Sequence, residues 1–353
     1  MSAVKYSRVF MDAIKYVLPP VVVSSEELEA RLAPLYDKLH IGMGQLEALT
    51  GVIERRWWEE EKGSSVTEGA IAAAHKAIAA TNVAPEDLGV VIYAGVCREH
   101  FEPATACSIA AALGTGPDLE VYDISNACLG VLNGILDVAN RIELGQIRAG
   151  MIVSCETARD INDTMIERML EENNMENFKM SLATLTGGSG AVAVVLTDGS
   201  FEPTEGRHQL LGGSTCSAPQ YHKLCRWGLE GLGAGVLRPF MSTDSVSVLK
   251  YGVDLGMRTW RSFLKTLEWT RDHVDKVVCH QVGSEHRKAI LKMLGIPLNK
   301  DYATYPFLGN IGTVSLPLTA AMAAERKFIK PGDHVGFLGI GSGLNCTMLG
   351  FKW

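Results

Sequence analysis

Cys128 has the most informative surroundings for chemistry. It follows a short apolar segment, 120–124, and a Ser-Asn-Ala turn, and it precedes an almost wholly apolar segment, 129–144. This pattern predicts a strand, a tight turn and a buried helix. At such a helix start, unpaired backbone N–H groups and the helix dipole favour a thiolate and can hold an oxyanion. Cys128 is therefore a candidate nucleophile, and a buried cysteine at the start of a core helix is the structural alternative.

Two further candidates lie in the C-terminal half of the chain. His280 ends the apolar segment 276–279, at the carboxyl end of a predicted strand, where open α/β sheets place their sites. Asn310 lies in a turn bracketed by glycines, and such a turn alone would explain an asparagine. Cysteine, histidine and asparagine also form the papain-like set. The central position of the cysteine, the α/β pattern and the composition oppose a protease, but leave other thioester or amide chemistry open.

A glycine loop, 339–343, also follows a predicted strand and could be read as a phosphate-binding loop. A dinucleotide site would need a helix directly after such a loop. The residues that follow have the pattern of another strand, so we do not expect a nucleotide to bind there.

The segments that position these residues alternate in type. Short apolar runs predict buried parallel strands, and longer segments between them predict helices, which is an α/β pattern. Residues 165–180, rich in methionine and acidic side chains, predict an amphipathic surface helix or a flexible wall of an apolar channel. The expected strands are 90–94, 120–124, 151–154, 191–196, 276–280 and 335–339, and the expected helical segments are 65–81, 129–144, 240–267 and 316–329.

The two halves of the chain echo each other. A charged turn followed by an apolar strand recurs twice, with Tyr93 matching His280 at a separation of 187 residues and Met151 matching Gly336 at 185. Two nearly equal separations indicate a duplicated unit. We expect an N-terminal half with the cysteine, a connecting or inserted segment rich in Gly, Pro, Ser and His, and a C-terminal half with the histidine and asparagine. The expected boundaries are 1–200, 201–239 and 240–353.

Composition narrows the classes of function. A chain of 353 residues predicts about two domains or one duplicated unit. The net charge of -7 argues against nucleic acid as a partner. No apolar run approaches the roughly 18 residues of a membrane span, and charges interrupt the N-terminus where a signal peptide would be apolar. We therefore expect a cytoplasmic protein. The eight cysteines form no CxxC pair, so neither a disulfide framework nor a metal site is expected.

Several ordered motifs together resemble the thiolase-superfamily condensing enzymes of the ketoacyl synthase III-like branch, over a span from about residue 20 to the C-terminus. The resemblance implies an α/β thiolase fold, in which duplicated βαβαβαββ halves form five αβαβα layers. The matching segments are 123–130 for the nucleophile region, 280–281 for the His motif, 309–315 for the Asn motif, 341–343 for the C-terminal oxyanion loop, 49–56 for an early conserved stretch and 330–333 for a familiar turn.

Within that branch the sequence is most similar to the OleA type, whose members join two long-chain acyl-CoA molecules head to head in olefin synthesis. Residues 100–106 resemble the glutamate loop of that type and carry Glu102, 26 residues before Cys128. Segments 221–226 and 341–346 also look like that type. The ketoacyl synthase III pattern has an aromatic residue in place of the glutamate and continues its His motif as HQANxR, which this chain lacks. Leu49 replaces its usual arginine, so no CoA-contact residues are assigned.

The resemblance implies a role for each residue. Cys128 carries the acyl group, and the backbone N–H groups of Cys128 and Ser342 form the oxyanion hole. His280 and Asn310 hold the enolate of a second acyl-CoA. Glu102 removes its α-proton, because a plain acyl donor cannot form an enolate by losing carbon dioxide. No metal or redox cofactor is implied, and fatty acyl-CoA thioesters are the substrates. The family is homodimeric, and the glutamate loop is expected to reach the active site of the neighbouring subunit.

The expected product is a β-ketoacyl-CoA or, after hydrolysis, a β-keto acid, which enzymes downstream in the same pathway would use. Three other functions remain open. A decarboxylating ketoacyl synthase III would use a malonyl donor. An acyl-binding subunit of a larger condensing enzyme would need none of the four side chains, which argues against it. An acyltransferase or thioesterase could use the same acyl-cysteine.

Overall fold

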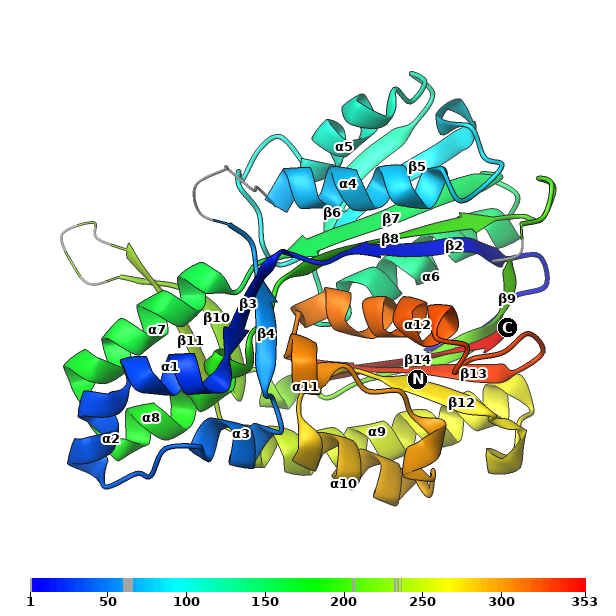
Figure 1. Cartoon of the computed structure of the whole chain (residues 1–353). Coiled ribbons are helices and arrows are strands. Elements are labelled where there is room, and N and C mark those ends of the chain that lie inside the picture. The colour runs from blue at the N-terminus through cyan, green and yellow to red at the C-terminus, as the bar shows by residue number, and fades with distance from the viewer. Residues whose placement is uncertain (1, 60–65, 205–206, 232, 234, 236) are drawn as a thin grey trace.

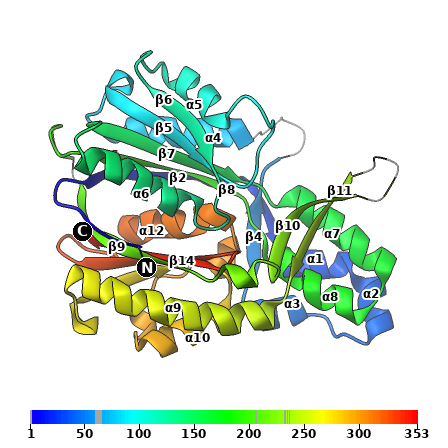
Figure 2. The same cartoon turned by 180° about the vertical axis from the view of Figure 1, so that it is seen from behind.

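The computed structural model stacks helices and sheets in five layers (Figure 1). Helices form both outer layers and also lie between the two sheets, and the view from behind shows the same order (Figure 2). The structure describes residues 2–59, 66–204, 207–231, 233, 235 and 237–353. From one outer layer to the other, the helices are α4 (Val66–Ile78) and α5 (Thr105–Leu113), then α6 (Gly130–Glu143) and α12 (Ser315–Glu325), then α9 (Ser245–Leu267) and α10 (Ser284–Leu294).

The first sheet contains strands of the N-terminal half in the order β6-β5-β7-β8-β2. β5 is parallel to β6 and β7, whereas β8 is antiparallel to both β7 and β2. Every residue of β7 and β8 is buried, because helices cover both faces of the sheet. The strands are β2 (Phe10–Val17), β5 (Leu88–Ala94), β6 (Glu120–Ile124), β7 (Ala149–Glu156) and β8 (Gly190–Thr197).

The second sheet has the order β12-β13-β14-β9 and, among the described residues, joins the first through two residue pairs between β9 and β2. This order repeats that of the first sheet with one strand left out. Where the first sheet has β6, the second has only an isolated parallel bridge between Val277 and Asp301. The strands are β9 (His208–Ser217), β12 (Lys276–Cys279), β13 (His334–Gly341) and β14 (Asn345–Lys352), with β1 (Ser2–Lys5) paired to β9.

The strand orders confirm the predicted duplication. Tyr93 lies on β5 and His280 directly follows β12, while Met151 lies on β7 and Gly336 on β13. These are equivalent strands of the two sheets, which explains the nearly equal separations in sequence. The division of the chain at residues 200 and 240 stays a prediction.

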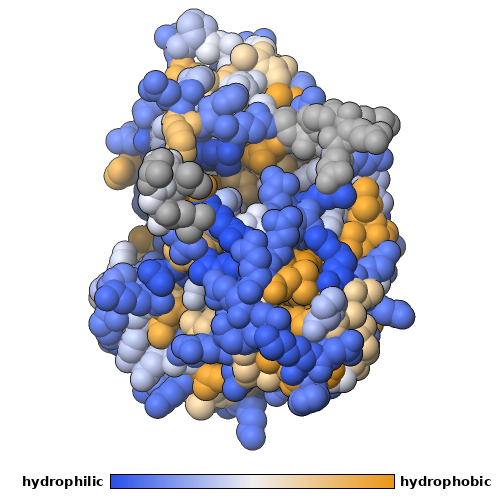
Figure 3. All heavy atoms as spheres, turned by 90° about the vertical axis from the view of Figure 1, so that its left-hand side faces the viewer, coloured by the Kyte–Doolittle hydropathy of each residue, from blue (hydrophilic) through white to orange (hydrophobic). Residues whose placement is uncertain are grey.

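The remaining elements gather at one end of the layers, on the left of Figure 1. Figure 3 views this end, whose surface is mostly hydrophilic with separate hydrophobic patches. The elements are β3 (Val21–Ser24), α1 (Ser25–Arg31), α2 (Ala33–Leu39), α3 (Gln45–Thr50), β4 (Glu54–Trp57), α7 (Arg159–Glu172), α8 (Met175–Ser181), β10 (Cys225–Gly231), β11 (Leu237–Thr243) and α11 (Tyr305–Leu308). Short 3-10 turns are Pro85–Asp87, Leu182–Thr186, Pro219–Tyr221, Arg271–His273, Leu298–Lys300 and Gly312–Val314.

Three expectations from the sequence need correction. Segment 191–196 is not a parallel strand, because burial on both faces produces an apolar run whatever the strand direction. Segment 201–239 is more than a connecting or inserted segment, since it holds β9, a strand of the second sheet, and most of the β10–β11 hairpin. Segment 240–267 begins in β11, and its helix starts only after the N-cap Asp244, whose side chain accepts from the backbone of Ser247.

The composition of β9 explains why the sequence suggests a loop there. β9 is hydrogen-bonded to β1 on one side and β14 on the other. A Cβ atom at Gly213 would lie 2.3 Å from the carbonyl oxygen of Met348, so only glycine fits between these backbones. Residues 205, 206, 232, 234 and 236 of the expected connection, and residue 65 of an expected helix, lie outside the described residues.

The methionine-rich segment 165–180 spans the second half of α7 and nearly all of α8, two helices rather than one, and the side chains of Met165 and Met169 are buried. Within the described ranges, no helix is both long and apolar enough to cross a membrane.

The C-terminal residue Trp353 is packed into the core between the central and lower layers. Its ring stacks on His208 with 3.8 Å between the ring centroids and lies near Phe337 and Phe351. Burial lowers the pKa of His208 to about 4, so the stacked imidazole is neutral at pH 7. The backbone N–H of Trp353 also donates to the carbonyl of Asp333 at 2.8 Å.

We expect Trp353→Ala to destabilise the protein by about 3–5 kcal/mol, the usual cost of removing a buried aromatic ring. Urea unfolding followed by circular dichroism measures the change. Trp227→Ala is the control, because Trp227 is 41% exposed on the β10–β11 hairpin and should cost far less. Equal losses for the two variants would show that Trp353 does not have the predicted packing role.

Candidate active site

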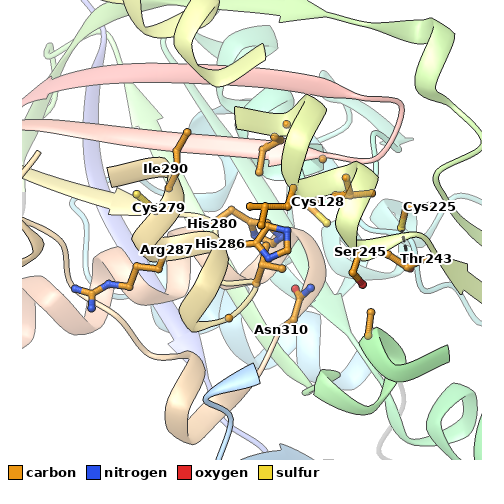
Figure 4. A pocket seen from close by; sticks show the side chains of 18 of the residues that line it. Cys128, Cys225, Thr243, Ser245, Cys279, His280, His286, Arg287, Ile290 and Asn310 are labelled. Carbon is orange, nitrogen blue, oxygen red and sulfur yellow. Dashed lines mark hydrogen bonds between the residues drawn. The ribbon is translucent and has the colours of Figure 1, made fainter. Parts of the chain in front are cut away.

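One largely apolar pocket with a cavity volume of about 350 Å³ brings together Cys128, His280 and Asn310. Figure 4 shows the three side chains directed toward one another from different elements. The pocket also includes Ser342, so the structure gathers four of the five positions named from the sequence. Its other walls come from the first half of α9, the start of α10, the β10–β11 hairpin and the turn before β8.

Cys128 lies in the turn between β6 and α6, as the sequence predicts. Ala127, just before it, has a φ of 45°, in the left-handed region. This conformation bends the chain sharply between strand and helix, so that Cys128 faces the pocket. At the start of α6, the backbone N–H of Val131 donates to the hydroxyl of Thr313 at 2.8 Å. The nucleophile turn is thereby tied to the loop that carries Asn310.

The loop after β13 is fastened to the same turn by three asparagines. Asn345 donates to the side-chain oxygen of Asn126 at 3.1 Å, and Asn126 donates to that of Asn133 at 2.7 Å. Gly341 lies beside the backbone nitrogen of Cys128, since a Cβ atom there would be 3.5 Å away. Ser342 follows Gly341 and also lines the pocket. This geometry is compatible with an oxyanion hole formed by the backbone N–H groups of Cys128 and Ser342, which stays a prediction.

The Cys128 thiol does not favour the thiolate as the sequence suggested. Burial, with smaller contributions from the nearby Cys225 and Glu156, raises its pKa to about 12, and its own backbone N–H acts in the opposite direction. The side chain remains partly accessible through the pocket. The start of α6 therefore supplies N–H donors, but desolvation outweighs their effect on the thiol.

His280 is buried at the end of β12, and its imidazole is neutral. Burial lowers its pKa to about 4, and the neighbouring His286 contributes in the same direction. Its Nδ1 has no hydrogen-bond partner in the described structure. A neutral imidazole offers one N–H donor and one acceptor, so it can both hold an oxyanion and relay a proton.

His286 is a pocket residue that the sequence analysis missed. It lies in the first turn of α10, and burial lowers its pKa as well. Its Nε2 is buried without a partner in the described structure, and Figure 4 shows its ring beside that of His280. The one feature of the sequence that could have pointed to His286 is its spacing of six residues from His280. That spacing brings the two rings together only because α10 packs beside β12.

Asn310 is held so that its amide nitrogen is available as a donor. Its side-chain oxygen accepts the backbone N–H of Gly312 at 3.1 Å, and its backbone N–H donates to the carbonyl of Thr186 at 2.8 Å. The preceding Gly309 has a φ of 66°, and a Cβ atom there would lie 2.2 Å from the same carbonyl. Glycine is therefore required beside Asn310, which gives a physical reason for the predicted glycine-bracketed turn.

Buried polar groups also fix the end of β12. Gln281 donates to the carbonyl of Cys279 at 2.7 Å and accepts the backbone N–H groups of Thr304 and Tyr305. Asp301 accepts the backbone N–H of Cys279 at 3.2 Å. Both contacts immobilise the strand end from which His280 enters the pocket.

Besides Cys128, the pocket is lined by Cys225, Cys279 and Cys346, which the sequence analysis did not assign to the site. Cys225 lines the pocket, and its sulfur lies 3.4 Å from the hydroxyl of Thr243, the contact dashed in Figure 4. Both residues lie at the base of the β10–β11 hairpin, in mutual register.

Glu102 is the one site residue that the chain does not bring into this pocket. It is exposed on the loop between β5 and α5, next to Phe101, whose exposed fraction is 99%. Among the described residues that line the pocket, the one carboxylate is Glu285. Its side chain is 65% exposed and pairs with Lys288 at 2.9 Å.

Comparison with known proteins shows the relationship over the whole chain. Residues 264–353 match the family described as 3-oxoacyl-[acyl-carrier-protein] synthase III C terminal. The acyl-CoA:acyl-CoA alkyltransferase of Shewanella oneidensis is 63% identical over 99% of this chain and 100% of its own length. The acyl-CoA:acyl-CoA alkyltransferase of Xanthomonas campestris is 33% identical over 99% of each chain.

A solved structure shows the same fold. A cysteine variant of OleA from Xanthomonas campestris, with bound lauric acid and lauroyl-CoA, has a TM-score of 0.89 and 32% identity. The match covers 99% of this chain and 100% of that chain.

We expect Cys128 to react slowly with iodoacetamide at pH 7, with a rate that still rises between pH 8 and pH 10. The raised pKa means that the thiolate fraction of Cys128 keeps growing by about tenfold per pH unit over this range, whereas that of an unperturbed cysteine, with a pKa of about 8.5, is already flattening as the pH approaches 10. Intact-mass analysis over time measures the rate, and Cys128→Ser identifies the site. A rate at Cys128 that levels off below pH 7 would indicate a preformed thiolate.

Proposed function

Because the chain belongs to the acyl-CoA:acyl-CoA alkyltransferases, thiolase-like condensing enzymes of the OleA type, we propose that it joins two fatty acyl-CoA molecules. The observation that carries this proposal is the single apolar pocket in which Cys128, His280 and Asn310 meet. A thiol nucleophile with neutral donors, in apolar surroundings, suits an acyl chain and the oxygens of a thioester.

In the first half-reaction, the sulfur of Cys128 attacks the thioester carbonyl of one acyl-CoA. The thiol proton passes through the neutral imidazole of His280 to the departing CoA sulfur. The backbone N–H groups of Cys128 and Ser342 hold the oxyanion. The C–S bond to CoA breaks, and an acyl-cysteine remains.

In the second half-reaction, a second acyl-CoA loses its α-proton to Glu102. The enolate oxygen is held by an N–H of His280 and the amide of Asn310, and the α-carbon attacks the acyl-cysteine. A C–C bond forms as the C–S bond to Cys128 breaks, and the departing thiolate takes up the proton that Glu102 removed, so that the thiol and the carboxylate are both regenerated. The product is β-ketoacyl-CoA, which hydrolysis by water would convert to the β-keto acid and free CoA. The chemistry needs no metal or redox cofactor, because neutral N–H donors stabilise both oxyanions.

We propose that Glu102 acts on the pocket of a second subunit in a homodimer. Its exposure on the surface of its own chain, beside the fully exposed Phe101, supports action on another chain. β6 ends the first sheet, and an unpaired edge strand can pair with its copy across a two-fold axis. Glu285, the carboxylate within the chain's own pocket, is the competing candidate for the base.

We propose a cytoplasmic location for the enzyme. All eight cysteines are free, including Cys216 and Cys346, which face each other directly across β9 and β14. Free thiols at such a cross-strand pair suit a reducing compartment. A β-keto product would pass to further enzymes of the same pathway.

We expect His280→Ala and Asn310→Ala to impair carbon–carbon bond formation more than acylation of Cys128. Each removes a donor to the enolate, and the loss of one such donor costs about 10²–10³ in rate. Single-turnover acylation followed by intact mass is compared with product formation under steady state. Near wild-type condensation in both variants would remove them from the enolate site.

We expect wild-type enzyme to form a β-keto product from acyl-CoA alone, and Glu102→Gln to be acylated on Cys128 without releasing that product. Mass spectrometry of adducts and products distinguishes the two steps. Glu285→Gln is the matched control, because it neutralises the pocket carboxylate and should retain turnover.

Other outcomes would favour other functions. A product that requires a malonyl thioester, with Glu102→Gln fully active, would indicate the decarboxylating synthase. Free fatty acid as the sole product would indicate a thioesterase. An acyl-cysteine that forms in the wild type without any turnover would indicate an acyl-binding subunit.

A further inference from the structure

We propose that Asp123 is a positioning residue that holds the glutamate arm, defined here as residues 96–106, in the shape in which Glu102 reaches a partner's pocket. This inference rests on the proposed function in trans. Asp123 lies on β6, five residues before Cys128, and its side chain is 12% exposed. It does not line the pocket and touches no reacting group of its own chain.

One end of the arm is fixed by both oxygens of the Asp123 carboxylate. Oδ2 accepts the backbone N–H of Thr105 at 2.9 Å, and Oδ1 accepts that of Ala106 at 3.0 Å. These are the first two residues of α5, whose N-cap Ala104 offers no side-chain cap. The carboxylate therefore replaces the missing cap and complements the positive end of the helix dipole.

The same carboxylate fixes the other side of the arm. The Nε of Arg98 donates to Oδ2 of Asp123 at 3.2 Å, and its guanidinium also donates to the carbonyl of Ile124 at 3.3 Å. One side chain on β6 thus closes the loop from Arg98 to Thr105.

The base of the arm is fixed by Glu156 at the end of β7. Its two carboxylate oxygens accept the backbone N–H groups of Val96 and Cys97 at 2.9 and 3.0 Å. The hydroxyl of Tyr93 donates to the carbonyl of Cys97 at 2.6 Å. Burial raises the pKa of Glu156, and these backbone donors act in the opposite direction.

The tip of the arm contrasts with its ends. Residues 100–103 are all exposed, and Phe101 has an exposed fraction of 99%. Because both ends of the arm are fixed, the exposed tip between them has already lost much of its conformational freedom. Less entropy is then lost when the tip enters another subunit, and the position of Glu102 is better defined.

A simpler role for Asp123 is local, because the nucleophile turn follows β6 directly. A local role affects the pocket of the chain that carries Asp123. A positioning role affects the pocket of the partner. Mixed dimers with one functional pocket distinguish these two roles of Asp123, because the arm and the cysteine of that pocket come from different subunits.

In this experiment an arm donor carries Cys128→Ala with Glu102 intact, and an acyl acceptor carries Glu102→Gln with Cys128 intact. The two chains carry different affinity tags, and the mixed dimer is purified over both. Only the donor's glutamate and the acceptor's cysteine can complete a turnover. Asp123→Ala, or the milder Asp123→Asn, is then placed in one chain at a time.

With Asp123→Ala in the arm donor, we expect turnover to fall by about tenfold to a hundredfold, because an ångström of misplacement costs on that order. Acylation of the acceptor's Cys128 should stay unchanged. The same substitution in the acceptor should change turnover less than about twofold. Asp123→Asn should show the same asymmetry with a smaller loss.

A loss confined to the acceptor, or equal in both chains, would overturn the positioning role and assign Asp123 to its own nucleophile turn. An unmodified mixed dimer without activity would instead overturn the action of Glu102 in trans, which is a separate failure. Asp198→Asn in the donor is the matched control. Asp198 also accepts from an arginine, Arg8 at 3.1 Å, and from a backbone N–H, that of Ser200, but lies at the far end of β8.

Discussion

Desolvation is the constraint on which the proposed chemistry depends. The pocket is apolar enough to raise the pKa of the Cys128 thiol to about 12 and to lower that of His280 to about 4. At pH 7 its reactive groups are therefore uncharged. Neutral groups hold water less tightly than ions do, so they leave the pocket free for an acyl chain. In apolar surroundings their N–H donors also stabilise more strongly the negative charge that develops on oxygen during the reaction. The same constraint acts on a carboxylate that is held permanently in such surroundings, because its charged form loses hydration. Burial raises the pKa of a carboxylate, as it does for Glu156. In the proposed mechanism, Glu102 lies on an exposed arm, and its carboxylate stays in water until it enters the partner's pocket.

The duplicated fold delivers the neutral groups to one point. Cys128 follows β6 of the first sheet, and His280 follows β12 of the second, so the central helices α6 and α12 lie between the strands that carry them. The loops meet through backbone contacts rather than salt bridges: Asn310 exchanges backbone hydrogen bonds with Thr186 and Gly188. Such contacts need no charge and tolerate no extra side-chain atoms, which is why glycines flank the asparagine.

The sequence predicts those parts of the site that carry a local signature. Cys128, His280 and Asn310 each lie where an apolar run ends in a turn, and the equal separations of matching strands reveal the duplication. The sequence does not predict β9, because a strand that lies close to the backbones of two neighbouring strands needs small residues such as Gly and Ser. The same residues are typical of loops. The direction of β8 was not predictable because burial on both faces gives one apolar pattern for either direction. His286 depends on how α10 docks against β12, and no pattern within α10 encodes that. The proposed action of Glu102 on a second chain has no local pattern behind it, and the sequence suggests it only through the family resemblance.

β6 connects the arm that carries Glu102 with the turn that carries Cys128. Its last residues organise the arm through Asp123, and the turn that follows presents Cys128. In the proposed mechanism, one strand therefore sets the positions of two side chains: Glu102, which acts on the partner, and Cys128, which acts in the subunit's own pocket. In the proposed dimer, β6 is also the edge strand that faces its copy, so the positions of both pockets are set by the same central pair of strands. A small shift of β6 within a subunit moves the nucleophile and the arm together, whereas a shift between subunits changes the distance from each base to each nucleophile. Packing across the edge strand, rather than the interior of either subunit, then determines how well the two half-sites fit.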